Sequence, residues 1–207
     1  MSSETTKIDL KERTELYNKV IGSIYPASKL SFQGNFIIGV WMIGNCYKNK
    51  TDYYGAYPHN YLKRITTLFP DCEPALHLFS GSLENEDVGY LDIRFDINKE
   101  CNPDVVGDAH KLSNYFDENF FDIIYADPDY SEEDANHRGI PLVNRNKVIK
   151  ECLKVLRPNG FIVWLDQVYP MYRKDELKLV GTIGLIRSTN HRVRTIFIYQ
   201  KQEASNE

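Results

Sequence analysis

The chain has 207 residues, 42% of them hydrophobic and 26% charged, an ordinary composition for a soluble globular protein with a substantial core. Its formal net charge of −4 at pH 7 excludes a generally basic surface, so any contact with nucleic acid must come from a local basic face or from a partner. The four cysteines are widely separated and form no Cys-x-x-Cys pair, which argues against a zinc site or a disulfide framework and favours free thiols in a reducing compartment.

A helix and an apolar extended segment are the first elements that the pattern predicts. Residues 8–24 place apolar side chains at helical spacing and end before Pro26, which favours an amphipathic helix. Residues 34–46 are apolar and interrupted by glycine, which indicates an extended segment or a hairpin. A short helix is expected over residues 60–69. We divide the chain into an N-terminal extension, a main domain and a polar tail: residues 1–52, 53–201 and 202–207.

Strands and helices alternate through the main domain. Short apolar runs predict strands at residues 75–79, 90–96, 105–108, 121–126 and 161–165. A helix is expected over residues 144–156, and residues 177–186 and 194–199 are expected to close the sheet as a hairpin. We therefore predict an α/β protein with a Rossmann-like, mostly parallel, seven-stranded sheet that carries helices on both faces, in one domain with an N-terminal extension.

The first three strands of this sheet end in residues that suit a nucleoside. In an open α/β sheet, ligands bind beyond the carboxyl ends of the strands. The first strand leads into Phe79-Ser80-Gly81-Ser82, whose small residues let a ligand approach the backbone. Asp96 ends the second strand, where a carboxylate can accept hydrogen bonds from both hydroxyls of a ribose, with Asp92 as the fallback. Asp108 ends the third strand and can accept a hydrogen bond from an adenine amino group.

The fourth strand ends in Asp127-Pro128-Asp129-Tyr130. Pro128 fixes its own φ and removes a backbone donor, which holds the neighbouring carbonyls in a set direction. Tyr130 can stack on a flat substrate. Taken alone, the segment is equally typical of a strand followed by an Asp-Pro turn. Acid or glycine at four successive strand ends favours the ligand site.

A nicotinamide dinucleotide site is the competing interpretation, because it also places an acid after the second strand. However, residues 79–82 do not form Gly-x-Gly-x-x-Gly, and residues 83–89 leave little room for a helix that binds a pyrophosphate. The sequence contains no Gly-Lys-Ser/Thr, which excludes a P-loop. The expected ligand is therefore a nucleoside without phosphates.

These segments together resemble the class I S-adenosylmethionine-dependent methyltransferases. The resemblance covers about residues 53–200 and rests on five stretches: residues 78–82, 95–98, 106–109, 121–130 and 156–160. Within that superfamily, Asp127-Pro128-Asp129-Tyr130 is similar to the Asp-Pro-Pro-Tyr motif of the amino-methyltransferases that modify adenine N6 or cytosine N4. Tyr57-Pro58-His59 and the helix after it resemble the segment that packs over the cofactor in those enzymes.

The resemblance implies an enzyme that transfers the methyl group of S-adenosyl-L-methionine to an exocyclic amino group of a base in DNA or RNA, with adenine N6 favoured. The implied cofactor-binding residues are Tyr57, Pro58, Phe79, Ser80, Gly81, Ser82, Asp96, Asp108, Ala109 and Asp127. The implied catalytic residues are Asp127, Pro128, Asp129 and Tyr130, and the substrate-binding residues are Tyr130, His137, Arg138 and Trp164. In these roles, Asp127 and the Pro128 carbonyl accept hydrogen bonds from the target amino group.

The chain also departs from the family pattern. Asp129 stands where the family has its second proline, and the turn after the first strand holds one glycine, Gly81. Residues 131–145 leave room for a loop but not for a target-recognition domain, although enzymes that flip a base need surface to hold the rest of the duplex. Two other interpretations therefore stay open: methylation of a small molecule or a protein side chain, and a catalytically silent subunit that binds a partner.

The expected partners are DNA or RNA and a second subunit for target recognition. A basic segment that can contact phosphates lies near the C-terminus, with solvated charge as the default interpretation: Arg187, His191, Arg192 and Arg194. We expect no metal. The N-terminus has no basic and then apolar signal region, and no apolar run approaches the roughly 20 residues that span a bilayer, so we expect a cytoplasmic protein without membrane contact.

Overall fold

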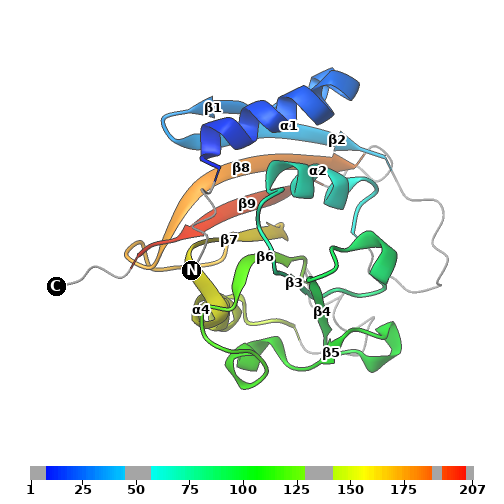
Figure 1. Cartoon of the computed structure of the whole chain (residues 1–207), viewed down its shortest axis with the longest axis vertical. Helices are drawn as coiled ribbons and strands as arrows, with labels where there is room; N and C mark the ends of the chain where they lie inside the picture. The colour runs from blue at the N-terminus through cyan, green and yellow to red at the C-terminus, as the bar shows by residue number, and fades with distance from the viewer. Residues whose placement is uncertain (1–7, 45–56, 129–141, 188–192, 204–207) are drawn as a thin grey trace, which may run out of the picture.

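One nine-stranded sheet forms the centre of the molecule, in the order β1-β2-β8-β9-β7-β6-β3-β4-β5 (Figure 1). The computed structural model describes residues 8–44, 57–128, 142–187 and 193–203. The strands are β1 Ser31–Gln33, β2 Phe36–Ile43, β3 Ala75–Leu78, β4 Ile93–Asp96, β5 Val105–Val106, β6 Phe121–Ala126, β7 Leu156–Asp166, β8 Leu177–Arg187 and β9 Val193–Lys201.

The five strands from β5 to β7 in this order are parallel, and β9 runs antiparallel to both β7 and β8. Ala126 at the end of β6 lies opposite Leu78 of β3 and Trp164 of β7. The carboxyl ends of these parallel strands therefore meet at one edge of the sheet, where ligands bind in this class of fold. The predicted α/β class with a mostly parallel sheet is confirmed.

The predicted number of seven strands is wrong, because the N-terminal residues add β1 and β2 to the same sheet. β2 pairs in parallel with β8, from Ile37 opposite Gly181 to Ile43 opposite Arg187. A Cβ at position 181 would lie 3.0 Å from the Ile37 Cβ, so glycine lets the two strands approach. β2 also buries Ile37, Trp41 and Ile43 on one face, and this burial joins the predicted extension to the main sheet.

Helices lie on both faces of the sheet. They are α1 Leu10–Ile24, α2 Tyr61–Leu68 and α4 Arg145–Val155, with the 3-10 helices η1 Pro26–Ser28, η2 Asn85–Asp87, η3 Lys99–Cys101 and η4 Ala109–Asn114. Side chains of α1 and α2, such as Tyr17 and Ile65, share one apolar cluster with β2 and β8, while Val148 and Cys152 of α4 belong to a second cluster on the other face. Only η2 fits between β3 and β4, as the sequence predicts.

β7 begins earlier than its predicted start at residue 161. It follows α4 directly at Leu156, which pairs with Phe121 of β6. The ladder shifts register between Phe121 and Ile123, and Asn159 has a φ of 61°. The turn residues at 157–160 therefore form an irregular start of the strand rather than a separate loop, because pairing with β6 continues on both sides of them.

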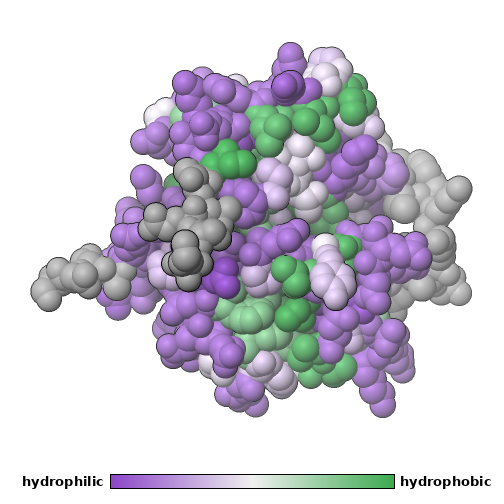
Figure 2. Space-filling model, in the orientation of Figure 1, coloured by the Kyte–Doolittle hydropathy of each residue, from purple (hydrophilic) through white to green (hydrophobic). Residues whose placement is uncertain are grey.

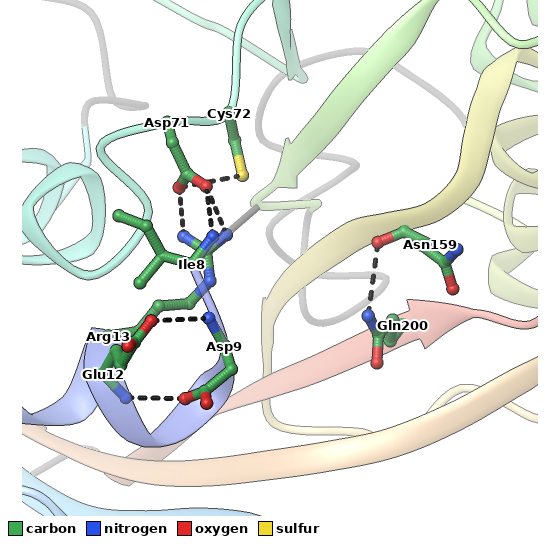
Figure 3. Close-up of polar contacts among 8 residues, drawn as sticks. All are labelled: Ile8, Asp9, Glu12, Arg13, Asp71, Cys72, Asn159 and Gln200. Atoms are coloured by element: carbon green, nitrogen blue, oxygen red, sulfur yellow. Dashed lines mark hydrogen bonds and ion pairs between the residues drawn. The ribbon is translucent and has the colours of Figure 1, made fainter. Parts of the chain in front are cut away.

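Arg13 fixes α1 to the segment before β3 (Figure 3). The Asp9 side chain accepts a hydrogen bond from the Glu12 amide and begins α1 with a capping box. Arg13 is fully buried and donates to both carboxylate oxygens of Asp71, while its guanidinium lies 5.2 Å from the centroid of the Phe161 ring. Burial raises the pKa of Asp71, but the hydrogen bonds and charge of Arg13 outweigh it and hold that pKa below its usual value.

The visible surface is mainly polar. In Figure 2 hydrophilic surface predominates, and hydrophobic surface lies in separate areas, one beside α1 and another in the half that holds β4 and β5. None of the described helices combines the length and the apolar character needed to cross a membrane. Within the ranges that the structure describes, no group of three or more metal-ligating side chains comes together.

Candidate functional site

A sharp turn follows β3 and aims its backbone at the end of β4. Phe79 and Gly81 both adopt positive φ values, 61° and 52°, which are unusual for a phenylalanine and unstrained for a glycine. The Ser80 amide donates to the Phe95 carbonyl over 3.1 Å, and the Leu83 amide donates to the Ser80 carbonyl over 3.1 Å. The turn therefore holds the Gly81 amide toward β4.

Asp96 receives that amide at the end of β4. The Gly81 amide donates to Asp96 Oδ2 and the Asn98 amide donates to Oδ1, each over 2.8 Å. A carboxylate oxygen has two lone pairs, so each oxygen keeps the capacity for one more hydrogen bond. Asp96 is half-buried and open to solvent on one side. This geometry fits two neighbouring hydroxyl donors, the arrangement that a ribose presents.

Asp92, the fallback for Asp96, is occupied by the fold. Its carboxylate accepts from the amides of Ala75 and Gly89, over 3.1 and 2.8 Å, and lies 3.3 Å from Nε2 of the buried His77. Burial raises the pKa of Asp92, but the His77 hydrogen bond and these amides outweigh it and lower that pKa below its usual value. Asp92 therefore ties β4 to β3, and Asp96 is the acid that faces the open edge.

Asp108 ends the segment after β5 and begins η4. The Asp108 Oδ1 atom accepts a hydrogen bond from the His110 amide over 2.9 Å and lies 2.7 Å from His110 Nδ1. The other ring nitrogen of His110, Nε2, accepts a hydrogen bond from the Asn144 amide over 3.0 Å. The Gly107 amide donates to the Asp96 carbonyl over 2.9 Å, which sets the two tips side by side. Both of these contacts with His110 use Oδ1 of Asp108, and Ala109 beside it is buried.

Asp127, directly after β6, lies near Arg194 of β9, and its charge acts on two tyrosines at the start of α2 and just before it. Asp127 Oδ1 is 3.9 Å from Nη1 of Arg194, and the two side chains are only 13% and 10% exposed. The rings of Tyr57 and Tyr61 stack with their centroids 5.2 Å apart. Burial raises the pKa of both phenols well above the usual value, and the charge of Asp127 raises both further. The charge of Asp96 contributes to the raised pKa of Tyr57 as well.

Buried polar atoms that lack a hydrogen-bond partner occur in several parts of the described structure, and some of them lie near these strand tips. Among the described side chains they include the Ser80 Oγ, the Tyr57 and Tyr61 hydroxyls and His77 Nδ1. Buried polar groups in folded proteins are nearly always hydrogen-bonded. Such a group of unsatisfied atoms at the carboxyl edge of a parallel sheet fits a ligand that supplies the missing partners. Together with the remaining acceptor capacity of Asp96, it fits a nucleoside that carries polar substituents.

Trp164 lies in the core beside the site rather than at its surface. Its side chain is fully buried, its Nε1 donates to Asp166 Oδ2 over 3.1 Å, and its ring meets Phe79 edge to face at 6.5 Å. Asp166 is also fully buried and pairs with Arg145 over 2.6 Å. These contacts account for Trp164 without a substrate, and its part in substrate binding stays a prediction.

The other predicted site residues divide into two groups. The structure describes those expected to hold the cofactor, and it brings the tips of β3, β4, β5 and β6 to one edge. Asp129, Tyr130, His137 and Arg138 lie outside the described residues. The sequence interpretation missed Tyr61 and His77. Tyr61 is the first residue of α2, only four residues after Tyr57, and its place in an aromatic segment could have indicated it. A histidine within an apolar strand gives no such indication.

Comparison with known proteins assigns no family to the chain. No family model and no curated protein matches it. Similar solved structures include TrmN from Thermus thermophilus (15% identity over 61% of this chain and 43% of that one, TM-score 0.43). They also include an rRNA methylase from Streptococcus thermophilus (8% identity, 62% and 86%, TM-score 0.43) and the N-methyltransferase NodS from Bradyrhizobium japonicum WM9 (13% identity, 70% and 94%, TM-score 0.49). The chain thus spans less than half the length of TrmN. Identities and TM-scores this low establish no activity for the chain.

Proposed function

We propose that this protein is an S-adenosyl-L-methionine-dependent methyltransferase that modifies an exocyclic amino group of a base in DNA or RNA, with adenine N6 favoured. The observation that carries the proposal is the shared carboxyl edge of the parallel strands, where Asp96 ends β4 with one amide on each carboxylate oxygen and Asp127 directly follows β6. A carboxylate suited to a ribose and a carboxylate suited to an amine therefore follow strands that end at the same edge of the sheet.

The cofactor is proposed to lie across the tips of β3, β4 and β5. Asp96 uses its remaining acceptor capacity for the two ribose hydroxyls, while Asp108 and Ala109 border the adenine. Residues 79–82 border the methionine part, with Tyr57 and Pro58 over it. When bound, S-adenosyl-L-methionine supplies a methyl group on a positively charged sulfur. The absence of a phosphate-binding glycine loop suits a cofactor that carries no phosphate.

The acceptor amine is proposed to lie against Asp127 and the Pro128 carbonyl. Both accept hydrogen bonds from the amine N–H groups and so direct its lone pair at the methyl carbon. The new N–C bond forms as the S–C bond breaks, and the amine, which gains a positive charge, then loses a proton to solvent. This chemistry needs no strong general base, so the gain comes from positioning and electrostatics. Tyr130 is proposed to stack on the base, with Asp129, His137 and Arg138 at the substrate edge.

Target recognition is proposed to depend on a partner subunit or on single-stranded substrate. The net charge is −4, and the predicted loop at residues 131–145 offers little surface for a duplex. The protein is thus expected to methylate an unpaired base more readily than one in a duplex.

The test is transfer of tritiated methyl from S-adenosyl-L-methionine to single- and double-stranded DNA and RNA oligonucleotides, followed by mass spectrometry of the nucleosides. The native protein should produce N6-methyladenine. Asp127→Ala should lower kcat by about 100-fold or more while the affinity for the cofactor stays close to native. Asp117→Ala, an exposed aspartate before β6, is the control and should behave as native.

The proposal separates into two parts that this test resolves. Label found only in small amines or in protein would overturn the nucleic-acid acceptor and keep the methyltransferase. A native protein that binds no cofactor, alone or with a recovered partner, would overturn the whole proposal and favour a silent subunit.

A further inference from the structure

The geometry points to Arg194 as the residue that positions Asp127 for the reaction, rather than as part of a basic face that contacts phosphates. This inference rests on the proposed function and adds to it a positioning residue from a distant strand. Arg194 is the second residue of β9, which is separated from β6 by β7 in the sheet order.

The side chain of Arg194 points into the protein. On β9 the residues Ile196 and Ile198 belong to the apolar cluster shared with α1 and α2, and alternation along the strand places Arg194 on that same face. Tyr125 of β6 belongs to this cluster as well, so Asp127 lies on the same face as Arg194. The 10% exposure of Arg194 follows from this direction, and a phosphate in solvent would find little of its side chain to contact.

The Asp127 side chain is largely shielded from solvent. It is 13% exposed, and its charge acts on the buried phenols of Tyr57 and Tyr61. Burying a carboxylate away from water costs free energy unless an opposite charge compensates it. The Arg194 guanidinium, 3.9 Å away, provides that charge from within the fold and gives the carboxylate a preferred direction.

The length of the contact indicates what Arg194 contributes. At 3.9 Å the two groups form an ion pair rather than a hydrogen bond, so the charge of Arg194 matters more than its forked geometry. Lysine should therefore replace it in part. A nearby cation also weakens the attraction of Asp127 for an amine that becomes positively charged. The contribution of Arg194 to the reaction must therefore come from orienting the Asp127 carboxylate, and this affects kcat rather than cofactor binding.

The test compares Arg194→Met, Arg194→Lys and a matched control, Arg157→Met. Arg157 pairs with Asp122 over 2.8 Å near the other end of β6, so the control removes an arginine–aspartate pair from the same strand away from the site. Arg194→Met should lower kcat by about tenfold with the KM for cofactor within about twofold of native. Arg194→Lys should recover at least part of that loss, and Arg157→Met should keep the native kcat.

A second measurement works without cofactor. In a double-mutant cycle of Asp127→Asn and Arg194→Met, the shifts in the urea midpoint of unfolding should be non-additive, because each variant breaks the same ion pair. Additive shifts, or a native kcat in Arg194→Met, would overturn the positioning role. So would a raised KM for oligonucleotide with unchanged kcat, which would return Arg194 to phosphate contact. Absence of methyl transfer by the native protein would instead be a failure of the proposed function, and would remove the reaction that Arg194 is inferred to serve.

Discussion

The tips of β4 and β7 each carry an aspartate at the carboxyl edge of the sheet, yet the two carboxylates are used in opposite ways. Asp166 at the end of β7 is fully buried and accepts hydrogen bonds from Arg145, from Trp164 Nε1 and from the amides of Gln167 and Val168. Asp96 at the end of β4 is half-buried and accepts one amide on each oxygen.

The difference shows that an acid at a strand tip is not by itself a ligand site. What separates the two is the acceptor capacity that remains after the fold has been satisfied, together with access to solvent. Asp166 has neither and holds β7 to the start of α4. Asp96 has both. Substitutions at the strand tips should therefore separate into losses of stability and losses of binding.

The largest expected effect is on stability, from Asp166→Asn. The substitution removes the carboxylate charge of Asp166 and leaves the mostly buried Arg145 guanidinium next to a neutral side chain. This should lower the free energy of unfolding by about 3–5 kcal/mol. Urea denaturation followed by tryptophan fluorescence measures it. A loss below about 1 kcal/mol would mean that the pair is solvated and that the contrast with Asp96 is overstated.

Asp96→Ala should show the opposite profile. The Gly81 and Asn98 amides reach water when the carboxylate is removed, so the free energy of unfolding should fall by only about 1–2 kcal/mol. The rise in melting temperature that S-adenosyl-L-methionine causes in the native protein should disappear. A variant that keeps the full cofactor-dependent rise would remove Asp96 from the site.

The pH dependence of stability should reveal Asp92, the acid that the fold uses next to Asp96. Its pKa is lower in the folded chain than in the unfolded one, so the unfolded state binds more protons as the pH falls. The stabilisation is therefore fully present above the unfolded pKa of about 4 and is lost as the pH falls through the lower folded value. Asp92→Asn should flatten the acid limb of the plot of unfolding free energy against pH.

The smallest expected effect on stability is at the β5 tip, where Asp108 both caps a helix and is proposed to contact the cofactor. Asp108→Ala removes the cap of η4 and should lower the free energy of unfolding by about 1 kcal/mol. It should also weaken cofactor binding, because Asp108 is proposed to border the adenine. His110→Ala removes the side-chain contact with Asp108 and the acceptor of the Asn144 amide. It should lower the free energy of unfolding by about 1 kcal/mol without changing cofactor affinity, as calorimetry can show.

The sequence predicted the elements of the fold well where the signal was local. Apolar runs located β3 and β6, and the residues beyond them, at 79–82 and at Asp127, fall at one edge because parallel strands align their ends. The pairing of β2 with β8 was missed, since contact between strands far apart in the chain leaves no local pattern. For the same reason Arg194 was grouped with neighbouring basic residues rather than with Asp127.

The different roles of Asp96, Asp92 and Asp166 could not be predicted from the local sequence pattern either. Each is an aspartate in or at the end of a short apolar run, and their roles differ only through partners from other segments, namely Gly81, His77 and Arg145. A count of acids at strand ends finds the site, but hydrogen-bond partners are needed to decide which acid faces a ligand.

The most direct test of the central claim is calorimetric titration of the native protein with S-adenosyl-L-methionine, and separately with ATP and NAD. If the strand tips form a nucleoside site without a phosphate cradle, S-adenosyl-L-methionine should bind at about one molecule per chain, and ATP and NAD should bind far more weakly. Tighter binding of ATP or NAD, or no binding of S-adenosyl-L-methionine by the folded chain, would contradict the account.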